Sequence, residues 1–437
     1  MRKTAADVNR TLETEAPALY RCLSPLGRRA FYPPDIPVQA AEARGARYNA
    51  TIGELTDGQG GAMPLPSMAA VLALSGEDRD RAFLYSPVGG LRELRERWRE
   101  WQRFGQDEAV PSSLPFVTDG LAHGLSLVAD LFAGPGRAVA VAAPFWGNYS
   151  QAFALRTGAE MRLGPGYRDG RFNPRALAEA LAEVPAGEPA VGLLNFPSNP
   201  GGYAPTAAER RELRASLLEI ADARPFVVLV DDAYAGLVYE ESSPPGSPFW
   251  ELAGVHEQLI AVKVDGATKE FFFFGGRVGF LTFGYRPGSP VAKALENKLA
   301  CLLRSTVGSP VALSQVVLLQ ALRDGAIRDQ VAAARRIARE RYAAVRPLLA
   351  ELDPHLLRSL PFNAGFFVLL ELPEELGVGA DAVRRHLLAR HDTGVVAIGE
   401  RYLRLAVCSV AAAALPELLR RVELGVSELA AATLPER

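Results

Sequence analysis

The stretch DGATKEFFFFGGRVGF, from Asp265 to Phe280, follows an apolar run and holds four phenylalanines in a row. Lys269 stands before these phenylalanines and Arg277 after them, eight positions apart (277 − 269 = 8). Gly275 and Gly276 precede the arginine. The stretch is either an apolar strand with charged ends, or a spacer that holds a lysine and an arginine at a fixed separation. The segments around it decide between these two interpretations.

The composition is that of a folded protein larger than one ordinary domain. The chain has 437 residues, of which 49% are hydrophobic and 22% charged, a balance typical of globular proteins. A net charge of −2 provides no basic field, which argues against nucleic acid or an anionic membrane surface as a partner. The charged N-terminus lacks the apolar segment of a secretion signal, and no apolar run is long enough to cross a membrane.

The cysteines and histidines favour a reducing compartment and do not indicate a metal site. Cys22, Cys301 and Cys408 are odd in number, far apart and without CxxC spacing. We therefore expect no disulfide framework, and we expect the protein in the cytoplasm. The five histidines show no metal-ligand spacing along the chain, so we expect no metal.

The middle of the chain alternates buried strands with helices. Each predicted strand is rich in Val, Leu or Ala and ends in a polar or turn residue; these runs are residues 137–144, 190–197, 226–234 and 260–266. Continuous apolarity indicates that both faces of the sheet are covered, as in parallel sheets. Between two of the runs, Thr206 and Glu209 form a capping-box pattern at the start of a helix. The order predicts a doubly wound α/β layer.

The last part of the chain has a different pattern. After about residue 310 it becomes helical and then α+β, with GFFVLLEL and YLRLAVCS as expected strands. We predict an N-terminal segment, residues 1–54, that packs with a smaller C-terminal domain, residues 311–437. Residues 55–310 form the expected large domain.

Polar side chains follow the predicted strands where ligands of open parallel sheets bind. They provide an aromatic ring, an amide, a carboxylate, a phenol and an amine, in the order Trp146, Asn199, Asp231, Tyr234 and Lys269. Upstream, FVTDGLAHGL (116–125) places a glycine turn between a short strand and a helix, which is a natural seat for a phosphate. A planar, phosphorylated heteroaromatic aldehyde would use all of these groups together with Arg277. Pyridoxal 5′-phosphate (PLP) is such a molecule: a lysine forms its Schiff base, a carboxylate pairs with its pyridinium nitrogen, and an arginine binds its phosphate.

These motifs, in this order, resemble the class I/II aminotransferase family, aspartate aminotransferase-like PLP enzymes of fold-type I. The resemblance extends over roughly residues 45 to 425. It implies a mostly parallel seven-stranded sheet between helices, plus a smaller α+β domain. GATKEFFFFGGRVGF resembles the family signature S-x-x-K-x(7)-R-x-G, which implies that Lys269 is the Schiff-base lysine and that Arg277 holds the phosphate.

Other motifs carry further implied roles around the cofactor. NFPSNPGG implies that Asn199 donates a hydrogen bond to the phenolic oxygen, and DDAYAGLVY implies that Asp231 pairs with the pyridinium while Tyr234 is a second donor to that oxygen. Asp232 is the competing carboxylate. PFWGNY resembles the stretch whose aromatic residue stacks on the ring, here Trp146. DGLAH resembles the phosphate turn, whose backbone N–H groups belong here to Gly120, Leu121 and Ala122.

The resemblance also implies how substrate and a second subunit take part. YLRLAVCS implies that Arg404 binds the substrate α-carboxylate, with Arg401 as the competing candidate. Asn199 and Trp146 also contact substrate in this interpretation. NATIGE resembles an N-terminal loop that closes over substrate at Gly53. YSPVGGLRELRERW implies that Tyr85 reaches the phosphate of the neighbouring subunit, and hence a homodimer with shared active sites.

The chain departs from the family pattern at two glycines. Gly266 replaces the serine expected three residues before the lysine, and Thr268 is the candidate substitute for the missing hydroxyl. Gly201 replaces the threonine of N-P-T-G, and we expect it to loosen the turn without affecting chemistry. The four phenylalanines are then expected to line and pack, while Gly275 and Gly276 let the backbone turn so that Arg277 points back.

The implied activity is amino transfer from an L-amino acid to a 2-oxo acid by a ping-pong mechanism. Aspartate, aromatic and broad-range donors all fit. A dicarboxylate specialist needs a second arginine, for which the N-terminal stretch offers Arg28 and Arg29. A C–S lyase, decarboxylase or synthase of the same fold is the first alternative. A PLP-binding regulator is the second, although residues 1–45 are too short and too acidic for a helix-turn-helix.

Overall fold

A seven-stranded sheet forms the centre of the larger part of the computed structural model, which describes residues 5–15, 23, 36–58, 61, 63–69 and 76–433. The strand order is β2-β10-β9-β8-β7-β3-β4. β10 runs antiparallel to both of its neighbours, β2 and β9, and the other neighbouring strands are parallel to each other. The strands are β2 (Phe116–Thr118), β3 (Ala138–Ala143), β4 (Glu160–Pro165), β7 (Ala190–Asn195), β8 (Phe226–Asp231), β9 (Leu259–Gly266) and β10 (Gly279–Phe283).

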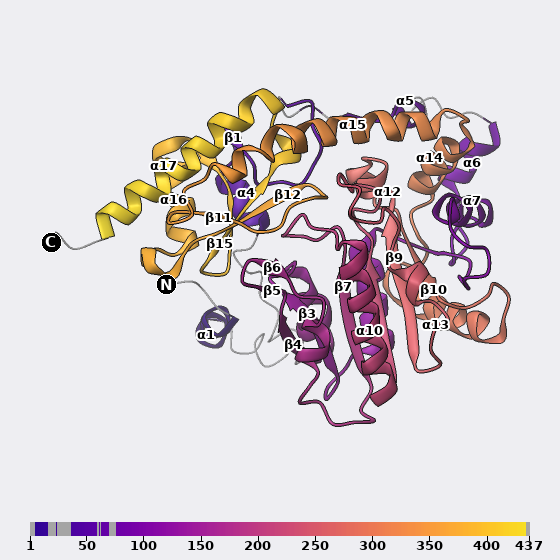
Figure 1. Ribbon diagram of the computed structural model, residues 1–437. Helices are drawn as coiled ribbons and strands as arrows, with labels where there is room; N and C mark the ends of the chain where they lie inside the picture. Colours follow the sequence, from indigo (N-terminus) through magenta and orange to yellow (C-terminus); the bar gives the residue numbers. More distant parts are fainter. Residues whose placement is uncertain are drawn as a thin grey trace.

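Helices cover both faces of this sheet, as its continuous apolarity predicts. Val227 and Leu229 of β8 belong to the cluster beneath α8 (Leu121–Phe132) and α13 (Pro290–Thr306). Phe226 and Val228 belong to the cluster beneath α10 (Ala207–Ala223), which lies along the opposite face (Figure 1). Each such buried side chain contributes about 1.5–3 kcal/mol to stability. The doubly wound α/β layer is confirmed.

The start of α10 confirms the predicted capping box. The Thr206 hydroxyl accepts a hydrogen bond from the Glu209 backbone N–H at 3.3 Å, and the Glu209 carboxylate accepts one from the Thr206 N–H at 2.7 Å. The two side chains thereby satisfy N–H groups that the first helical turn leaves without partners.

A second, four-stranded antiparallel sheet lies in the C-terminal part of the chain. Its order is β11 (Arg358–Ser359), β12 (Phe367–Glu371), β15 (Tyr402–Ala406) and β14 (Val396–Ile398). α16 (Ala380–His391) and α17 (Leu415–Thr433) pack beside it (Figure 1). The N-terminal segment joins this part, because β1 (Tyr48–Asn49) pairs in parallel with β13 (Thr393–Gly394).

The long helix α15 (Ile327–Val345) connects the two parts (Figure 1). Ile327 and Val331 near its start pack in a cluster with Trp98, whereas Val345 at its end packs in the C-terminal core. α14 (Ala312–Arg323) packs against α6 (Gly76–Phe83) and α7 (Arg92–Arg103) of the larger part. The domain boundaries at 54/55 and 310/311 stay a prediction.

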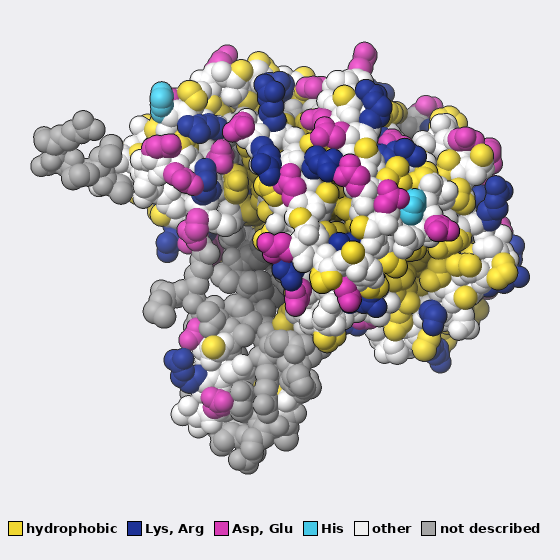
Figure 2. Space-filling view, turned by 60° about the horizontal axis from the view of Figure 1, so that its bottom comes forward, with side chains coloured by type: hydrophobic (Ala, Val, Ile, Leu, Met, Phe, Trp, Pro, Cys, Tyr) yellow, Lys and Arg dark blue, Asp and Glu magenta, His cyan; other side chains and the backbone are white. Residues whose placement is uncertain are grey.

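Further elements are short or peripheral. They include α1 (Ala5–Glu15), α4 (Ile36–Glu42), α5 (Pro66–Ala69), α9 (Ala176–Ala180), α11 (Phe249–Leu252), β5 (Tyr167–Arg168), β6 (Arg171–Phe172) and a π-helix (Ser150–Leu155). Acidic and basic side chains are interspersed over the face shown in Figure 2. None of the described helices is long and apolar enough to cross a membrane.

Apart from its ends, which belong to β9 and β10, the stretch DGATKEFFFFGGRVGF is a spacer and not a strand. It contains α12 (Ala267–Glu270) and a 3-10 turn (Phe274–Gly276) before β10 begins. Phe271 is fully buried against Trp98. Gly275 and Gly276 lie in this 3-10 turn directly before Arg277, but neither has a positive φ; Phe272 and Arg277 do. The Phe273 ring packs directly against Gly276. A Cβ at position 276 would lie 2.1 Å from this ring, so a glycine is needed there.

Three glycines let β9, β10 and the start of α8 approach closely. Gly279 pairs with Gly266 in the ladder between β10 and β9. A Cβ at Gly279 would lie 2.8 Å from the backbone carbonyl carbon of Gly120, and one at Gly266 would lie 2.7 Å from the carbonyl oxygen of Val278. The absence of a serine at position 266 follows from this packing, because the backbone leaves no room for a side chain.

Gly279→Ala is expected to lower the free energy of unfolding by about 1–3 kcal/mol, because backbone atoms that cannot rotate away block the added methyl group. The measurement is the urea midpoint of the purified variant. Gly134→Ala is the matched control, since a Cβ at Gly134 meets nothing within 4 Å. Equal midpoints for the two variants would contradict the packing argument.

Candidate active site

A cavity of about 480 Å³ lies where the strands of the large sheet end. Both sheets and the N-terminal segment contribute to its wall. The sequence-predicted residues that line it are Gly53, Leu121, Trp146, Asn199, Asp231, Tyr234, Thr268, Lys269, Arg277 and Arg404. Residues more than 300 positions apart therefore meet in one site, although their roles stay predictions.

Lys269 extends into this cavity from α12, directly after β9. Burial lowers the pKa of its amine; the Asp231 carboxylate opposes this shift, and Arg277 adds to it. Its Nζ lies 5.8 Å from the centre of the Tyr234 ring. A lowered pKa increases the fraction of neutral amine, which is the form that attacks a carbonyl or accepts a proton.

Asp231 is a buried carboxylate at the end of β8. Tyr149 donates a hydrogen bond to its Oδ2 at 2.6 Å, and the Ala233 N–H donates one to its Oδ1 at 3.1 Å. Burial raises the pKa of Asp231, while these two donors oppose that shift. Asp232 is also buried, and burial raises its pKa to about 7. Asp231 lines the cavity and Asp232 does not, so the geometry favours Asp231.

Arg404 reaches the cavity from β15 of the C-terminal sheet. It is 2% exposed, and its two Nη groups donate to Asn199 Oδ1 at 3.0 Å and to the Thr51 carbonyl oxygen at 2.8 Å. Its guanidinium carbon lies 4.2 Å from the centre of the Phe367 ring. The competing Arg401 instead forms ion pairs with Glu371 and Glu374 outside the cavity.

An anion seat forms where α8 begins. Gly120 caps the helix with a φ of 86°, and a Cβ there would lie 2.3 Å from Nη2 of Arg277. Arg277 and the N–H groups of the first turn, which includes Ala122, thus converge on one place. The Thr268 hydroxyl oxygen is buried without a hydrogen-bond partner in the described part of the chain. A helix N-terminus, a guanidinium and a spare hydroxyl together fit a phosphate group.

Two site residues lie inside the quoted motifs NFPSNPGG and PFWGNY but receive no role from the motif comparison. Tyr149 holds Asp231, and the side chain of Asn195 links the Asn199 backbone N–H, at 2.7 Å, to the Asp231 carbonyl oxygen, at 2.9 Å. Asn195 is the last residue of β7, and a polar residue at the end of a predicted strand is a sequence signal for a ligand site. Tyr149 follows Trp146 by three residues and packs edge-on against it, but nothing in its local sequence distinguishes it from a core tyrosine.

Tyr85 is not brought to the cavity of its own chain. It is 96% exposed and follows two exposed apolar residues, Phe83 and Leu84. It does not line the cavity. Any contact of Tyr85 with a cofactor therefore requires another chain.

Comparison with known proteins identifies the family. The model of the family described as "Aminotransferase class I and II" matches residues 49–422. The chain therefore belongs to this family of PLP-dependent transaminases. An arginine–pyruvate transaminase of Pseudomonas aeruginosa is 30% identical over 353 residues, covering 79% of this chain and 83% of that one. A 2-aminoadipate transaminase of Thermus thermophilus is 27% identical, covering 83% and 88%.

Solved structures share the fold. An aminotransferase of Anaerococcus prevotii has a TM-score of 0.81 at 18% identity, covering 92% of this chain and 98% of that one. A kynurenine aminotransferase of Pyrococcus horikoshii, solved with PMP, has a TM-score of 0.78 at 20% identity, covering 94% and 98%. The predicted fold, enzyme class and cofactor are confirmed.

Tyr149→Phe is expected to weaken PLP binding about tenfold to a hundredfold, because losing a hydrogen bond to a charged group costs about 1.5–3 kcal/mol. The measurement is the dissociation constant of PLP from the apoprotein. Tyr402→Phe, a tyrosine outside the cavity, is the matched control. If both variants bind PLP like the unaltered protein, Tyr149 does not support Asp231 as described.

Proposed function

We propose that this transaminase uses Lys269 as its Schiff-base lysine and Asp231 as the partner of the cofactor's ring nitrogen. The observation that carries the proposal is the convergence, in one cavity, of an amine with a lowered pKa, a buried carboxylate and an anion seat. When bound, PLP supplies an aldehyde that condenses with amines and a ring that accepts electrons.

The other functions in the proposed reaction belong to side chains of the cavity. The Lys269 amine takes the proton from the substrate Cα as general base. Asp231, held by Tyr149, keeps a proton on the ring nitrogen. Burial raises the pKa of Tyr234, so it stays protonated and can donate to the phenolic oxygen, as can Asn199 through Nδ2. Trp146 stacks on the ring.

Arg404 is the proposed receptor for the substrate α-carboxylate. Its planar guanidinium can bind a carboxylate through two parallel hydrogen bonds, and this orientation selects which Cα bond reacts. Trp146 and Asn199 lie at the same cavity and contact the bound amino acid in this scheme. Gly53 belongs to the loop proposed to close over it.

The proposed donor is aspartate, an aromatic amino acid or a broad range of amino acids. Several apolar side chains line the cavity and favour an aromatic or broad-range donor; they are Ile36, Ile52, Phe274 and Phe367. Among the described lining residues, the arginines are Arg277 and Arg404. Arg28 and Arg29, the candidates for binding a second carboxylate, lie outside the described residues.

A homodimer with shared sites is the proposed assembly. Phe83, the last residue of α6, and the following Leu84 and Tyr85 form an exposed apolar stretch, which suits a subunit contact. Tyr85 would then reach the phosphate held in the partner chain. The cytoplasm is the proposed location, in keeping with the free thiols of Cys301 and Cys408.

With one amino acid and no 2-oxo acid, the enzyme is expected to release about one 2-oxo acid per site and then stop, because ping-pong transfer leaves the amino group on the enzyme. Mass spectrometry of the 2-oxo acid, with each amino acid tested in turn, measures this and ranks the donors. Sustained release of 2-oxo acid without an acceptor would identify a lyase, and sustained release of CO2 and an amine would identify a decarboxylase. Lys269→Ala should have no turnover and Lys293→Ala normal turnover; activity in the first variant would refute the assignment of Lys269.

Mixing Tyr85→Ala with Lys269→Ala subunits tests whether Tyr85 acts across the interface. If each variant alone is inactive, random reassociation should restore about one quarter of wild-type activity, because half of the dimers then carry one complete site. Activity is assayed after co-refolding of the two chains. No recovery would contradict the proposed role of Tyr85 across the interface.

A further inference from the structure

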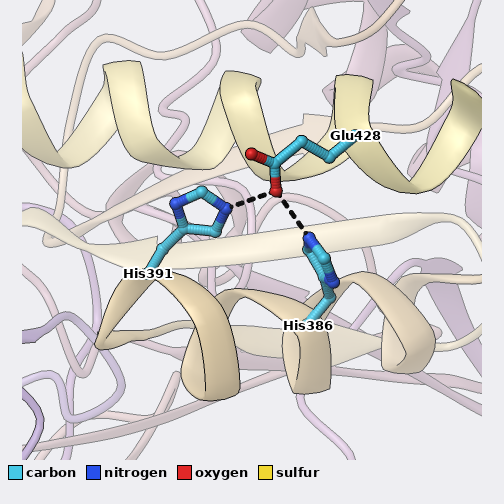
Figure 3. A group of neighbouring side chains, drawn as sticks. All are labelled: His386, His391 and Glu428. Atoms are coloured by element: carbon cyan, nitrogen blue, oxygen red, sulfur yellow. Dashed lines mark hydrogen bonds and ion pairs between the residues drawn. The ribbon is translucent and has the colours of Figure 1, made fainter.

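Two histidines and a glutamate meet between α16 and α17, outside the active-site cavity. His386 lies within α16, His391 ends that helix, and Glu428 lies on α17. Both imidazole rings point toward one carboxylate oxygen (Figure 3). Each Nε2 lies 2.8 Å from Glu428 Oε2, and the ligand atoms of all three residues lie within 4.8 Å of one another.

The packing of the two helices holds these side chains in place. Gly425 on α17 is so close to α16 that an added Cβ would lie 2.5 Å from Leu387 Cδ2 and 3.3 Å from His391 Cδ2. Leu387 is fully buried in the C-terminal core. Nη1 of Arg421 donates to the His391 carbonyl oxygen at 2.6 Å, which secures the end of α16. The packing of the core therefore fixes the two helices that carry the cluster.

The donor set suits a divalent transition metal. Two imidazole nitrogens and one carboxylate oxygen are ligands that zinc accepts, whereas magnesium and calcium prefer oxygen alone. With metal–ligand distances of about 2.0–2.1 Å, the ligand atoms of a tetrahedral zinc site lie about 3.3 Å apart. Each Nε2–Oε2 separation of 2.8 Å needs to widen by only about half an ångström. The Glu428 side chain is 43% exposed, so water can complete the coordination.

The protons on the two rings can be accommodated when a metal binds. For Nε2 of each ring to donate to Glu428, it must carry a proton. A metal needs the Nε2 lone pair, so this proton moves to Nδ1 or to solvent. Neither Nδ1 makes a hydrogen bond within the described part of the chain, and each is available to carry the proton.

We propose that His386, His391 and Glu428 form a zinc site that joins the C-terminal helix α17 to α16. The site is separate from transamination, because none of its ligands lines the active-site cavity. The spacing of these residues along the sequence does not indicate a metal site. The histidines are five residues apart (391 − 386 = 5), and the glutamate follows 37 residues later (428 − 391 = 37). Its effect is a cross-link between two helices that stabilises the folded C-terminal part.

Calorimetric titration of the tag-free holoenzyme with zinc chloride near neutral pH tests the site. The expected stoichiometry is one zinc ion per chain. His386→Ala and Glu428→Gln should each weaken binding more than about tenfold, because each removes one of three ligands. Glu428→Gln is the sharper variant, since the amide oxygen can still accept from both histidines while being a poor zinc ligand. His355→Ala, an exposed histidine of the same part of the chain, and Cys301→Ser are the matched controls and should bind like wild type.

Thermal unfolding supplies a second readout. Zinc should raise the unfolding midpoint of wild type and of His355→Ala in a concentration-dependent manner, and EDTA should reverse the rise, because a ligand of the folded state stabilises it by mass action. Glu428→Gln should show no such rise. If wild type binds zinc no more tightly than Glu428→Gln, or if Cys301→Ser abolishes binding, the proposal is wrong and the cluster is only a hydrogen-bonded bridge.

Discussion

The burial of Asp231 at the end of β8 is the constraint on which the active site depends. A carboxylate removed from water costs several kcal/mol unless donors or a cation compensate it. Tyr149 and the Ala233 N–H compensate part of this cost, while burial still raises the pKa of the carboxyl group. A protonated ring nitrogen placed beside Asp231 would lower that pKa again. Binding of a protonated heteroaromatic ring and ionisation of Asp231 are therefore coupled, and each makes the other more favourable.

The sheet register places the partners of Asp231 around it. Asn195 lies directly opposite Asp231 in the ladder between β7 and β8, and Val264 lies opposite it on β9. Because parallel strands end at the same edge of the sheet, these three residues lie side by side although they are distant in sequence. At the neighbouring strand pair, Gly266 and Gly279 allow the backbone of α8 to come near. The anion seat thus forms beside the carboxylate at a spacing that the backbone itself determines.

Much of this arrangement could be predicted from the sequence, and the parts that could not have physical causes. The strands and the positions of Asp231, Asn199 and Lys269 follow from apolar runs with polar ends. The left-handed backbone at Phe272 and Arg277 could not be foreseen, because glycine is the usual residue for it and two glycines stand nearby. The support of Asp231 by Tyr149 depends on how a π-helical segment lies against β8, and this is a tertiary contact without a sequence pattern.

Arg404 connects three separate parts of the chain at the cavity. It belongs to the C-terminal sheet, and it donates to Asn199 of the large sheet and to Thr51 of the N-terminal segment. A substrate carboxylate that binds Arg404 must share its Nη groups with these two oxygens or replace one of them. Both oxygens are neutral acceptors, whereas a carboxylate is charged and forms hydrogen bonds roughly twice as strong. If Arg404 receives the substrate as proposed, the carboxylate can compete for it, and its arrival would change the bonds that hold the three parts together. Such an arrangement would link the binding of the carboxylate to the relative positions of the two sheets, which is the physical requirement for the proposed loop near Gly53 to close only over a bound amino acid.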